Sequence, residues 1–383
     1  MPWATAVEPL WDREREWTRR LAIVRSARAF VYTSTFYIEY DDYGRAFLEA
    51  LADAQARGVA VHLLIDGFGQ RLGGVLMTAS ARAALRRLLQ ELQAAGADVR
   101  HYRPTRAAGR WLGGGHHVKI QVSDAGEAIF GSSNLTRQSF EGWNEYAVRL
   151  TGPVVRTLLQ CYAALGAPVS AAHLAALGDE DVQPPDAIPV DVWLCDPNQL
   201  QGPLGPLGWA GPNPLTERLR AMIDAARTSI AMTSFYFKPV DAIIEALVRA
   251  AERGVAIEVH HSHLDALPAT ELAWIAAAAH YRRLLGAGIT IYENRRGEHS
   301  KILLVDDAWV ACGSYNFEHA AHDRLAEAML ASRHPALVAP ARAIIEELRG
   351  LAWNERVTHA SLEALPLRLR VKQRVLGPFK RWM

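Results

Sequence analysis

Hydrophobic and polar residues follow a strand–helix alternation that runs through the chain twice. Short apolar runs predict strands, and stretches with apolar residues three and four positions apart predict helices. In the first half, strands are expected at residues 29–38, 59–65 and 99–102, and helices at 12–28, 45–57 and 79–95. In the second half, strands are expected at residues 229–237, 255–260 and 289–292, and helices at 215–227, 240–253 and 272–285. Strands that alternate with helices predict an α/β fold with α/β/α layers.

The two halves also share short sequences, which indicates an internal duplication. ARGVAVHLLID begins at Ala56, and ERGVAIEVHHS begins at Glu252, at the same place in the order of elements. A repeat unit of about half the chain is too long for a solenoid and predicts two domains. We expect these domains at residues 1–166 and 214–358, joined by an Ala-, Pro- and Gly-rich linker at 167–213 and followed by a basic, amphipathic tail at 359–383.

The most informative repeat is a set of polar residues at fixed spacing, present once in each half. The first copy consists of His117, Lys119, Asp124, Gly131, Ser132, Asn134 and Glu145. The second copy consists of His299, Lys301, Asp306, Gly313, Ser314, Asn316 and Glu327, at the same offsets and without an insertion. Agreement at all of these positions, within otherwise different sequence, is far outside chance.

The spacing predicts that these side chains lie together. In an extended strand, His117 and Lys119 point to one face while the apolar residues beside them point to the core. A turn at Asp124 and a second short strand then bring Ser132 and Asn134 back beside the polar face. Each copy therefore groups an imidazole, an ammonium, a hydroxyl and a carboxamide. All four can donate hydrogen bonds, and together they suit a phosphate.

The two copies resemble the signature of the phospholipase D superfamily, which is H-x-K-x4-D, then G-S/G-x-N, then a downstream acid. The sequences LLIDGFG and SFYFKP are similar to those of bacterial cardiolipin synthases, in the form that lacks N-terminal transmembrane helices. The resemblance implies two α/β/α sandwich domains with pseudo-twofold symmetry and one active site at their interface. The second copy departs from the pattern, because it has Ala321 where Ser139 stands in the first and lacks an Asn before its closing acid.

The resemblance and the residue types together imply the chemistry. His117 is expected to attack a phosphodiester and form a phosphohistidine, because a neutral imidazole is available near neutral pH. His299 is expected to give a proton to the departing alkoxide. The groups expected to bind the phosphate oxygens are those of Lys119, Lys301, Ser132, Asn134, Ser314 and Asn316.

The acidic residues of the two copies are expected to act on these groups. Glu145 and Glu327 are expected to accept from an imidazole N–H and fix its tautomer, and the sequence leaves open which Glu faces which His. Asp124 and Asp306 are expected to support the site by bracing the lysines or capping the turns. No metal ion and no cofactor is expected, because the two lysines supply the positive charge.

The implied reaction is phosphatidyl transfer from one phospholipid to an alcohol acceptor such as phosphatidylglycerol. Two other activities use the same chemistry, namely a phospholipase D hydrolase with water as acceptor and, less favoured, a nuclease. The formal net charge of the chain is only +1, which argues against the continuous basic groove of a nuclease. The expected partners are therefore a phospholipid substrate and an anionic membrane surface, and no nucleic acid.

Two further polar clusters allow more than one interpretation. His260, His261 and His263 suggest a zinc site, but adjacent histidines at a strand end point to opposite faces, so a solvated loop or a headgroup contact is favoured. A local basic stretch precedes the first copy of the motif and ends at Trp111. It is either an ordinary solvated loop or a segment attracted to an anionic bilayer. Its basic residues are Arg100, Arg103, Arg106 and Arg110.

The chain has no run of eighteen apolar residues, no apolar signal segment and only three, widely spaced cysteines. We therefore expect a cytoplasmic protein that is attached peripherally to the inner face of the cell membrane. The tail is expected to make this contact, as a helix up to Gly377-Pro378 or as a strand, and the alternative is packing on the second domain. The residues that would share an apolar helical face are Leu367, Val371, Val375, Phe379 and Trp382.

Overall fold

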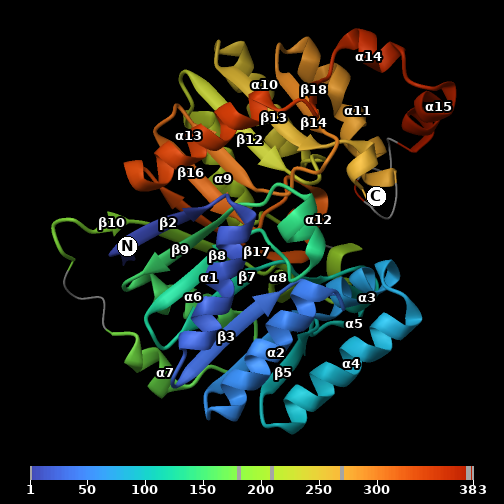
Figure 1. Ribbon diagram of the computed structural model, residues 1–383. Coiled ribbons are helices and arrows are strands. Elements are labelled where there is room, and N and C mark those ends of the chain that lie inside the picture. Colours follow the sequence, from blue (N-terminus) through green and yellow to red (C-terminus); the bar gives the residue numbers. More distant parts are fainter. Residues whose placement is uncertain (1, 179–182, 208–210, 268–270, 377–380, 382–383) are drawn as a thin grey trace.

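The computed structural model describes residues 2–178, 183–207, 211–267, 271–376 and 381. Two large sheets dominate it, one in each half of the chain (Figure 1). The strand order of the first sheet is β2 (Ala6–Leu10), β9 (Ala147–Thr151), β8 (Glu127–Gly131), β7 (Lys119–Ser123), β3 (Phe30–Thr35), β4 (Ala60–Asp66) and β5 (Asp98–Tyr102). The strand order of the second sheet is β11 (Asp191–Cys195), β17 (Leu325–Ser332), β16 (Trp309–Gly313), β15 (Ile302–Val305), β12 (Ser229–Ser234), β13 (Ala256–Ser262), β14 (Thr290–Asn294) and β18 (Asn354–Arg356).

The first seven strands of the second sheet repeat the topology of the first sheet. β3, β4 and β5 are parallel to one another, as are β12, β13 and β14, and the other neighbouring pairs among these strands are antiparallel. The repeated motif forms the hairpin β7–β8 in one sheet and β15–β16 in the other. The duplication in the sequence is thus a duplication of the fold, which confirms the expected pair of α/β halves.

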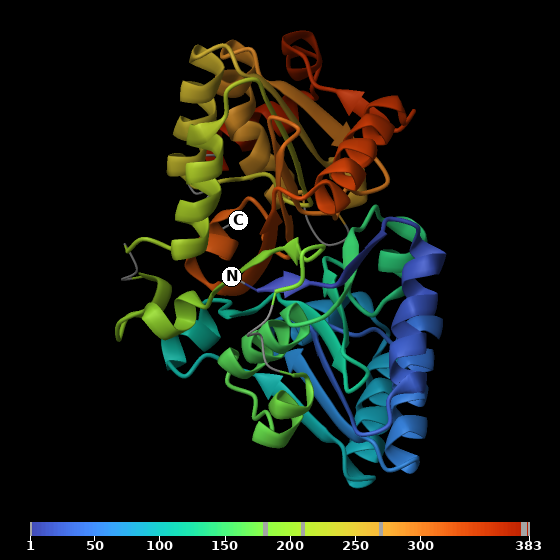
Figure 2. The ribbon, with the colours of Figure 1, turned by 90° about the vertical axis from the view of Figure 1, so that its left-hand side faces the viewer.

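Helices cover the outer face of each sheet. They are α1 (Arg13–Ser26), α2 (Asp42–Ala56) and α4 (Ala79–Ala94) in the first half, and α9 (Pro214–Ala225), α10 (Asp241–Glu252) and α11 (Leu272–Gly286) in the second. Figure 2 shows the blue helices of the first half and the yellow helices of the second on opposite sides of the molecule. Alternation along β3 explains the layering, because Val31 packs with the outer helices whereas Phe30 and Tyr32 face the other core.

The inner faces of the two sheets share one hydrophobic core. The helices that follow the last strand of each motif, α6 (Val154–Ala164) and α13 (Pro335–Gly350), both contribute to it. Phe130 on β8 and Leu330 on β17 belong to the same cluster of buried side chains. Burial of apolar surface therefore holds the two halves together and fixes their relative position.

A helix stands where the glycines of residues 66–69 predict a loop. This helix, α3 (Gly67–Leu76), begins at Asp66, whose carboxylate accepts a hydrogen bond from the backbone N–H of Gly69. A Cβ atom on Gly69 would lie 2.4 Å from the carbonyl oxygen of Phe36, and one on Gly73 would lie 2.5 Å from the ring of Tyr37. The glycines let α3 lie directly on the segment after β3, and this close approach is their physical role.

The segment at residues 167–213, which we expected to be a linker, contributes to both halves. It contains α7 (Ala171–Ala176), β10 (Ile188–Pro189), β11, α8 (Pro197–Leu200) and the short helix η2 (Gly205–Leu207). β11 forms the edge of the second sheet, while β10 pairs with β1 (Trp3–Ala4). The second sheet therefore begins before residue 214. The other short elements are α5 (Ala107–Trp111), β6 (Gly115–His116), η1 (Gln138–Gly142), η3 (Leu264–Ala266) and α12 (His319–Asp323).

The tail is helical and rests on the second half. It forms α14 (His359–Glu363) and α15 (Leu367–Leu376), and α15 packs on α11 with Leu369 only 5% exposed. Glu271 at the start of α11 pairs with Arg368 and Lys372 of α15. Leu367, Val371 and Val375 of α15 are exposed, whereas Leu376 is partly buried. The expected Gly377-Pro378, Phe379 and Trp382 lie outside the described residues. None of the helices in the described part of the chain is long and apolar enough to span a bilayer.

Candidate active site

The histidines of the two motifs face each other where the two halves meet. The ring centroids of His117 and His299 are 6.3 Å apart. The backbone N–H of His117 donates to the carbonyl of Ala326, and that of His299 donates to the carbonyl of Asn144, at 2.7 and 2.8 Å. Each histidine is therefore anchored by the opposite half, and the site requires both halves.

The carboxylates cross between the halves in the same way. Glu145 of the first half lies 2.8 Å from Nδ1 of His299, measured to its Oε2 atom. Glu327 of the second half lies 3.2 Å from Nδ1 of His117, measured to Oε1, and the Ser314 carbonyl lies 2.9 Å from the same nitrogen. A carbonyl oxygen can only accept, so Nδ1 of His117 carries the hydrogen. Its Nε2 atom then keeps a lone pair, as a nucleophile requires.

The two carboxylates differ in their support. Glu145 accepts hydrogen bonds from the hydroxyl groups of Ser132 and Ser139, the latter at 2.8 Å. Glu327 accepts from the hydroxyl group of Ser314, but the position that corresponds to Ser139 is Ala321. The second carboxyl group therefore has one hydroxyl donor fewer in its surroundings.

This difference appears in the pKa values of the four groups. Burial raises the pKa of Glu145, but attraction to His299 and the hydrogen bonds outweigh it and lower that pKa to about 2. Burial raises the pKa of Glu327 well above its usual value, although Lys119 opposes the shift. Burial lowers the pKa of His117 well below its usual value, and the two lysines add to the effect. Burial also lowers the pKa of His299, to about 4, against the opposing charge of Glu145.

The lysines of the motifs are buried beside the imidazoles. The Lys119 ammonium donates to the backbone carbonyl of His117 at 2.7 Å, and that of Lys301 donates in the same way to His299. Burial lowers the pKa of Lys301 to about 8 and that of Lys119 well below its usual value. An anion that enters the site would favour the charged form of both lysines. The pair is thus a receptor for the negative charge of a phosphodiester.

The serines of the motifs, which we expected to bind phosphate, contact the carboxylates in this structure. The hydroxyl group of Ser132 donates to Glu145 and accepts from the backbone N–H of Tyr146, and Ser314 makes the equivalent pair of contacts with Glu327 and residue 328. Their hydrogen-bonding capacity is taken up by positioning the carboxylates. Asn134 differs, because its buried Oδ1 atom accepts no hydrogen bond within the described residues.

The second asparagine and the two aspartates of the motifs have structural partners. The Oδ1 atom of Asn316 accepts from the backbone N–H of Phe235 at 3.3 Å. The carboxylate of Asp124 accepts from backbone N–H groups of residues 28 and 30, just before and at the start of β3. Asp306 does the same for residues 227 to 229, just before and at the start of β12. The aspartates therefore tie the motif hairpin to the neighbouring strand, and they do not bond to the lysines.

Aromatic side chains that the sequence analysis did not single out enclose the imidazoles. The ring of Trp143 stacks on His299 at 4.8 Å, and the ring of Phe235 meets the same imidazole edge to face at 4.7 Å. Phe36 contacts His117 edge to face at 4.8 Å. Each histidine side chain is almost fully removed from solvent, with 4% of the residue exposed. The sequence feature that could have identified Trp143 as a site residue is its position two residues before Glu145.

The three neighbouring histidines at the end of β13 have separate partners. His260 contacts the side chain of Asn354 at 2.9 Å, and His261 contacts the hydroxyl group of Tyr281 at 2.6 Å. The Nδ1 atom of His263 accepts from the backbone of residue 265 at 3.1 Å. These contacts hold the imidazoles in different directions, as expected for successive residues of a strand.

Comparisons with known proteins agree with this geometry. Residues 21–164 and 219–349 match the family described as "Cardiolipin synthase, PLD-like domain". Cardiolipin synthase B of Escherichia coli K12 is 27% identical over 332 residues, which cover 82% of this chain and 72% of that protein. Cardiolipin synthase A of Pseudomonas fluorescens is 28% identical over 310 residues, which cover 77% and 58%.

A solved structure adds evidence on the fold. Phosphatidylserine synthase of Haemophilus influenzae superposes with a TM-score of 0.72 and 15% identity, over 100% of this chain and 96% of that one. This likeness concerns the fold alone, whereas the family match spans most of both halves and contains both copies of the motif. The chain therefore belongs to the cardiolipin synthase, PLD-like domain family.

Proposed function

We propose that the protein is a phosphatidyltransferase of the cardiolipin synthase type. The observation that carries the proposal is the pair of facing imidazoles, each contacted at Nδ1 by a carboxyl group from the opposite half, beside two buried lysines. The relatives named cardiolipin synthase support the class of reaction. The substrate that fits the proposal is phosphatidylglycerol, which would act as both donor and acceptor.

In the first step, Nε2 of His117 attacks the phosphorus of the donor lipid. A P–N bond forms while the P–O bond to the leaving glycerol breaks. The departing alkoxide takes the proton from Nε2 of the His299 imidazolium. The lysine ammonium groups and the Asn134 carboxamide would hold the nonbridging oxygens, where negative charge develops.

In the second step, a hydroxyl group of the acceptor lipid gives its proton to His299 and attacks the same phosphorus. The P–N bond breaks, His117 returns to the neutral form, and the imidazolium of His299 is restored. The phosphatidyl group has then moved from one alcohol to another, with atoms and charge in balance. The mechanism is of the double-displacement kind, with a covalent intermediate.

The electrostatic difference between the halves supports this assignment of roles. His299 lies beside a carboxylate with a lowered pKa, so a proton on its ring is stabilised by a full negative charge. His117 lies beside a carbonyl oxygen and a carboxyl group with a raised pKa, so its ring tends to stay neutral. A neutral nucleophile and a chargeable acid are what the two steps require.

Hydrolysis is the second candidate, because water could replace the acceptor alcohol. The aromatic enclosure of the imidazoles and their low exposure favour transfer, since a site that excludes water protects the phosphohistidine. Nuclease activity is less favoured, because a protein with a net charge of +1 has little overall electrostatic attraction for the polyanionic backbone of a nucleic acid.

An assay with two substrates decides among the three activities. The purified protein is incubated with phosphatidylglycerol vesicles and, separately, with single-stranded DNA, and the products are separated. If the protein is a phosphatidyltransferase, the products are diphosphatidylglycerol and free glycerol. The His117→Ala variant is the negative control. Phosphatidic acid as the sole lipid product would establish the hydrolase, and cleavage of the DNA without lipid turnover would establish the nuclease.

We further propose that the protein works at the inner face of the cell membrane, attached peripherally. Its tail helix α15 supports this, because it presents an exposed apolar stripe together with the exposed side chains of Arg370 and Arg374, as segments bound to a bilayer surface do. The exposed apolar residues of this stripe are Leu367, Val371 and Val375.

A further inference from the structure

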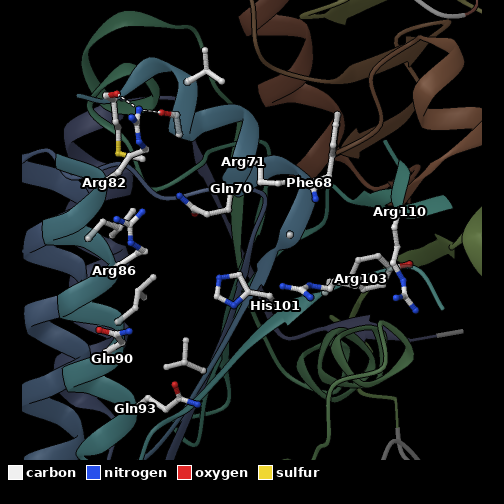
Figure 3. A pocket seen from close by; sticks show the side chains of 18 of the residues that line it. Phe68, Gln70, Arg71, Arg82, Arg86, Gln90, Gln93, His101, Arg103 and Arg110 are labelled. Atoms are coloured by element: carbon white, nitrogen blue, oxygen red, sulfur yellow. Dashed lines mark hydrogen bonds between the residues drawn. The ribbon is translucent and has the colours of Figure 1, made fainter. Parts of the chain in front are cut away.

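A groove of about 1070 Å³ lies in the first half of the chain, between α3, α4 and β5 (Figure 3). It is separate from the catalytic centre, and among its described lining residues it shares none of the motif side chains. Phe68 on its wall lies 6.4 Å from the ring of Phe36, which itself lies 4.8 Å from the ring of His117. Two aromatic rings therefore stand between the groove and the attacking imidazole.

The groove is strongly cationic. Five arginines and His101 are among its described lining residues, and no Asp or Glu is. Figure 3 shows the helix that carries Arg86 and the strand that carries His101 on opposite sides of the groove. Burial and the nearby charge of Arg103 lower the pKa of His101, which places this imidazole within the positive field. The groove therefore attracts anions and repels cations.

Three of these arginines have no hydrogen-bond acceptor within the described part of the chain. Arg82 and Arg110 are held by hydrogen bonds to backbone carbonyls. Arg71, Arg86 and Arg103 are exposed, and the described residues provide them with neither a hydrogen-bond acceptor nor an ion pair. A guanidinium group presents a planar fork of N–H donors that matches a phosphate in geometry. These three exposed guanidinium groups are therefore available to an anion from outside the chain.

The floor and lip of the groove are apolar. Leu85 and Leu89 on α4 and Val99 on β5 also line it, and both leucines are buried. Val75 on its lip is 73% exposed, and Trp111 at the end of the neighbouring α5 is 88% exposed. A free inorganic anion would leave this apolar surface unused. A molecule with both an anionic head and hydrocarbon chains satisfies both parts of the groove.

We propose that this groove binds an anionic phospholipid outside the catalytic centre. The phosphodiester lies on the guanidinium groups of Arg71, Arg86 and Arg103, and an acyl chain follows the apolar floor beside Leu85 and Leu89. The exposed apolar lip faces the bilayer from which the lipid comes. The inference rests on the proposed function in one respect, because it places a lipid of the substrate class next to the catalytic site.

A matched pair of double variants tests the groove. Arg86→Gln with Arg103→Gln removes two of its free cations, whereas Arg87→Gln with Arg106→Gln removes two exposed arginines that are close in sequence but do not line it. The probe is dihexanoyl phosphatidylglycerol, kept below its micellar concentration so that no surface field contributes. Binding is followed by hydrogen exchange of residues 67–76 and 79–94 and by titration calorimetry.

The proposal predicts protection of both segments by the lipid and a loss of affinity of about tenfold or more in the first variant, because two charge-assisted donors to the phosphate are removed. The second variant should bind like the original protein. Equal binding by both variants would overturn the proposal. Equal protection by glycerophosphoglycerol or inorganic phosphate would also overturn it, because the site would then hold an anion without acyl chains.

The outcome can be separated from that of the proposed function. If the lipid protects the groove but no phosphatidyl transfer occurs, the proposed function is rejected and the lipid site is supported. If transfer occurs on vesicles but the groove is not protected, the proposed function is supported and the lipid site is rejected. The thermal midpoints of both variants are measured first, and similar values show that the substitutions leave the fold intact.

Discussion

Glu145 of the first half contacts the imidazole of His299 in the second half at 2.8 Å, whereas the equivalent contact of Glu327 with His117 measures 3.2 Å. The shorter contact joins an imidazole to a carboxylate with a lowered pKa, and the longer one joins an imidazole to a carboxyl group with a raised pKa. Two motifs with the same spacing thus produce two histidines that differ in how readily they carry a proton.

Replacing each glutamate by glutamine should therefore have unequal effects. Glu145→Gln removes the charge that raises the pKa of His299, so this pKa should fall further and the alkaline limb of the pH–rate profile should move to lower pH. Turnover near neutral pH should drop by about 10²-fold or more, as when other catalytic dyads lose their carboxylate. Steady-state rates of phosphatidyl transfer across the pH range provide the measurement.

Glu327→Gln is the matched control for this prediction, because the raised pKa of Glu327 means that less negative charge is lost on substitution. Its turnover should stay within about tenfold of the original, with the alkaline limb in place. A larger loss from Glu327→Gln than from Glu145→Gln would reverse the assignment of acid and nucleophile.

Introducing a hydroxyl group at position 321 should make the two halves more alike. In Ala321→Ser, the new hydroxyl can donate to Glu327 as Ser139 donates to Glu145, which should lower the pKa of Glu327 and raise that of His117. A nucleophile with a higher pKa is protonated at higher pH, so the acid limb should move upward. Each unit of this shift costs about tenfold in rate on that limb.

The control for this variant is Ala320→Ser, in which the hydroxyl group is one residue away. It should leave both limbs of the profile where they are. An unchanged acid limb in Ala321→Ser, in a protein that folds normally, would show that the asymmetry between Ser139 and Ala321 does not tune the nucleophile.

The aspartates of the two motifs should matter for stability more than for turnover. Removing the carboxylate of Asp124 or Asp306 leaves backbone N–H groups before β3 or β12 without their acceptor. Each Asp→Ala variant should lose about 1–3 kcal/mol of unfolding free energy, measured by denaturant titration. The folded fraction should keep turnover close to that of the original protein, and a large loss of turnover without a loss of stability would place these residues in the chemistry.

The contribution of Asp306 should also depend on pH. Burial tends to raise its pKa, but the hydrogen bonds from residues 227 to 229 outweigh burial and lower it. A lowered pKa in the folded state means that the stabilisation is present above the unfolded value of about 3.9 and is lost as the pH falls below it. The stability difference between the original protein and Asp306→Ala should therefore shrink below that pH.

The apolar stripe of the tail should contribute to membrane attachment. Deleting the tail would also expose the hydrophobic residues that Leu369 covers. A more specific variant replaces only Leu367, Val371 and Val375 by Gln. This variant should sediment less with anionic liposomes than the original protein, because the stripe can no longer enter the interface. A variant with Gln at exposed Leu204 and Leu207 serves as the control, and equal sedimentation of the tail variant and the original would dismiss the stripe as an anchor.

Local patterns were sufficient to predict most of the fold. The outer helices and the parallel strands were predicted from the spacing of apolar residues, which involves only residues close in sequence. The identical spacing of the two motifs showed which elements of the two halves correspond. The region after β4 was the exception. There Gly67 and Gly69 suggested a loop, but Gly69 lets the helix α3 pack closely on Phe36, a tertiary contact that no local pattern shows.

The sequence predicted which residues form the candidate site, but it predicted only part of how they are arranged. His117 and His299 face each other as expected, but the crossed pairing with Glu145 and Glu327 depends on how the halves dock. Ser132 was expected at the phosphate because its hydroxyl can donate. The structure shows that it donates to the buried carboxylate of Glu145, a contact that depends on the fold around the motif.

Trapping the covalent intermediate tests the central claim most directly. The protein is mixed with phosphatidylglycerol labelled in its phosphate, quenched rapidly in alkali because phosphohistidine is labile to acid, and digested for peptide mapping. The account predicts a phosphatidyl group on His117 and none in the His117→Ala variant. A label on His299, or turnover without any labelled histidine, would contradict it.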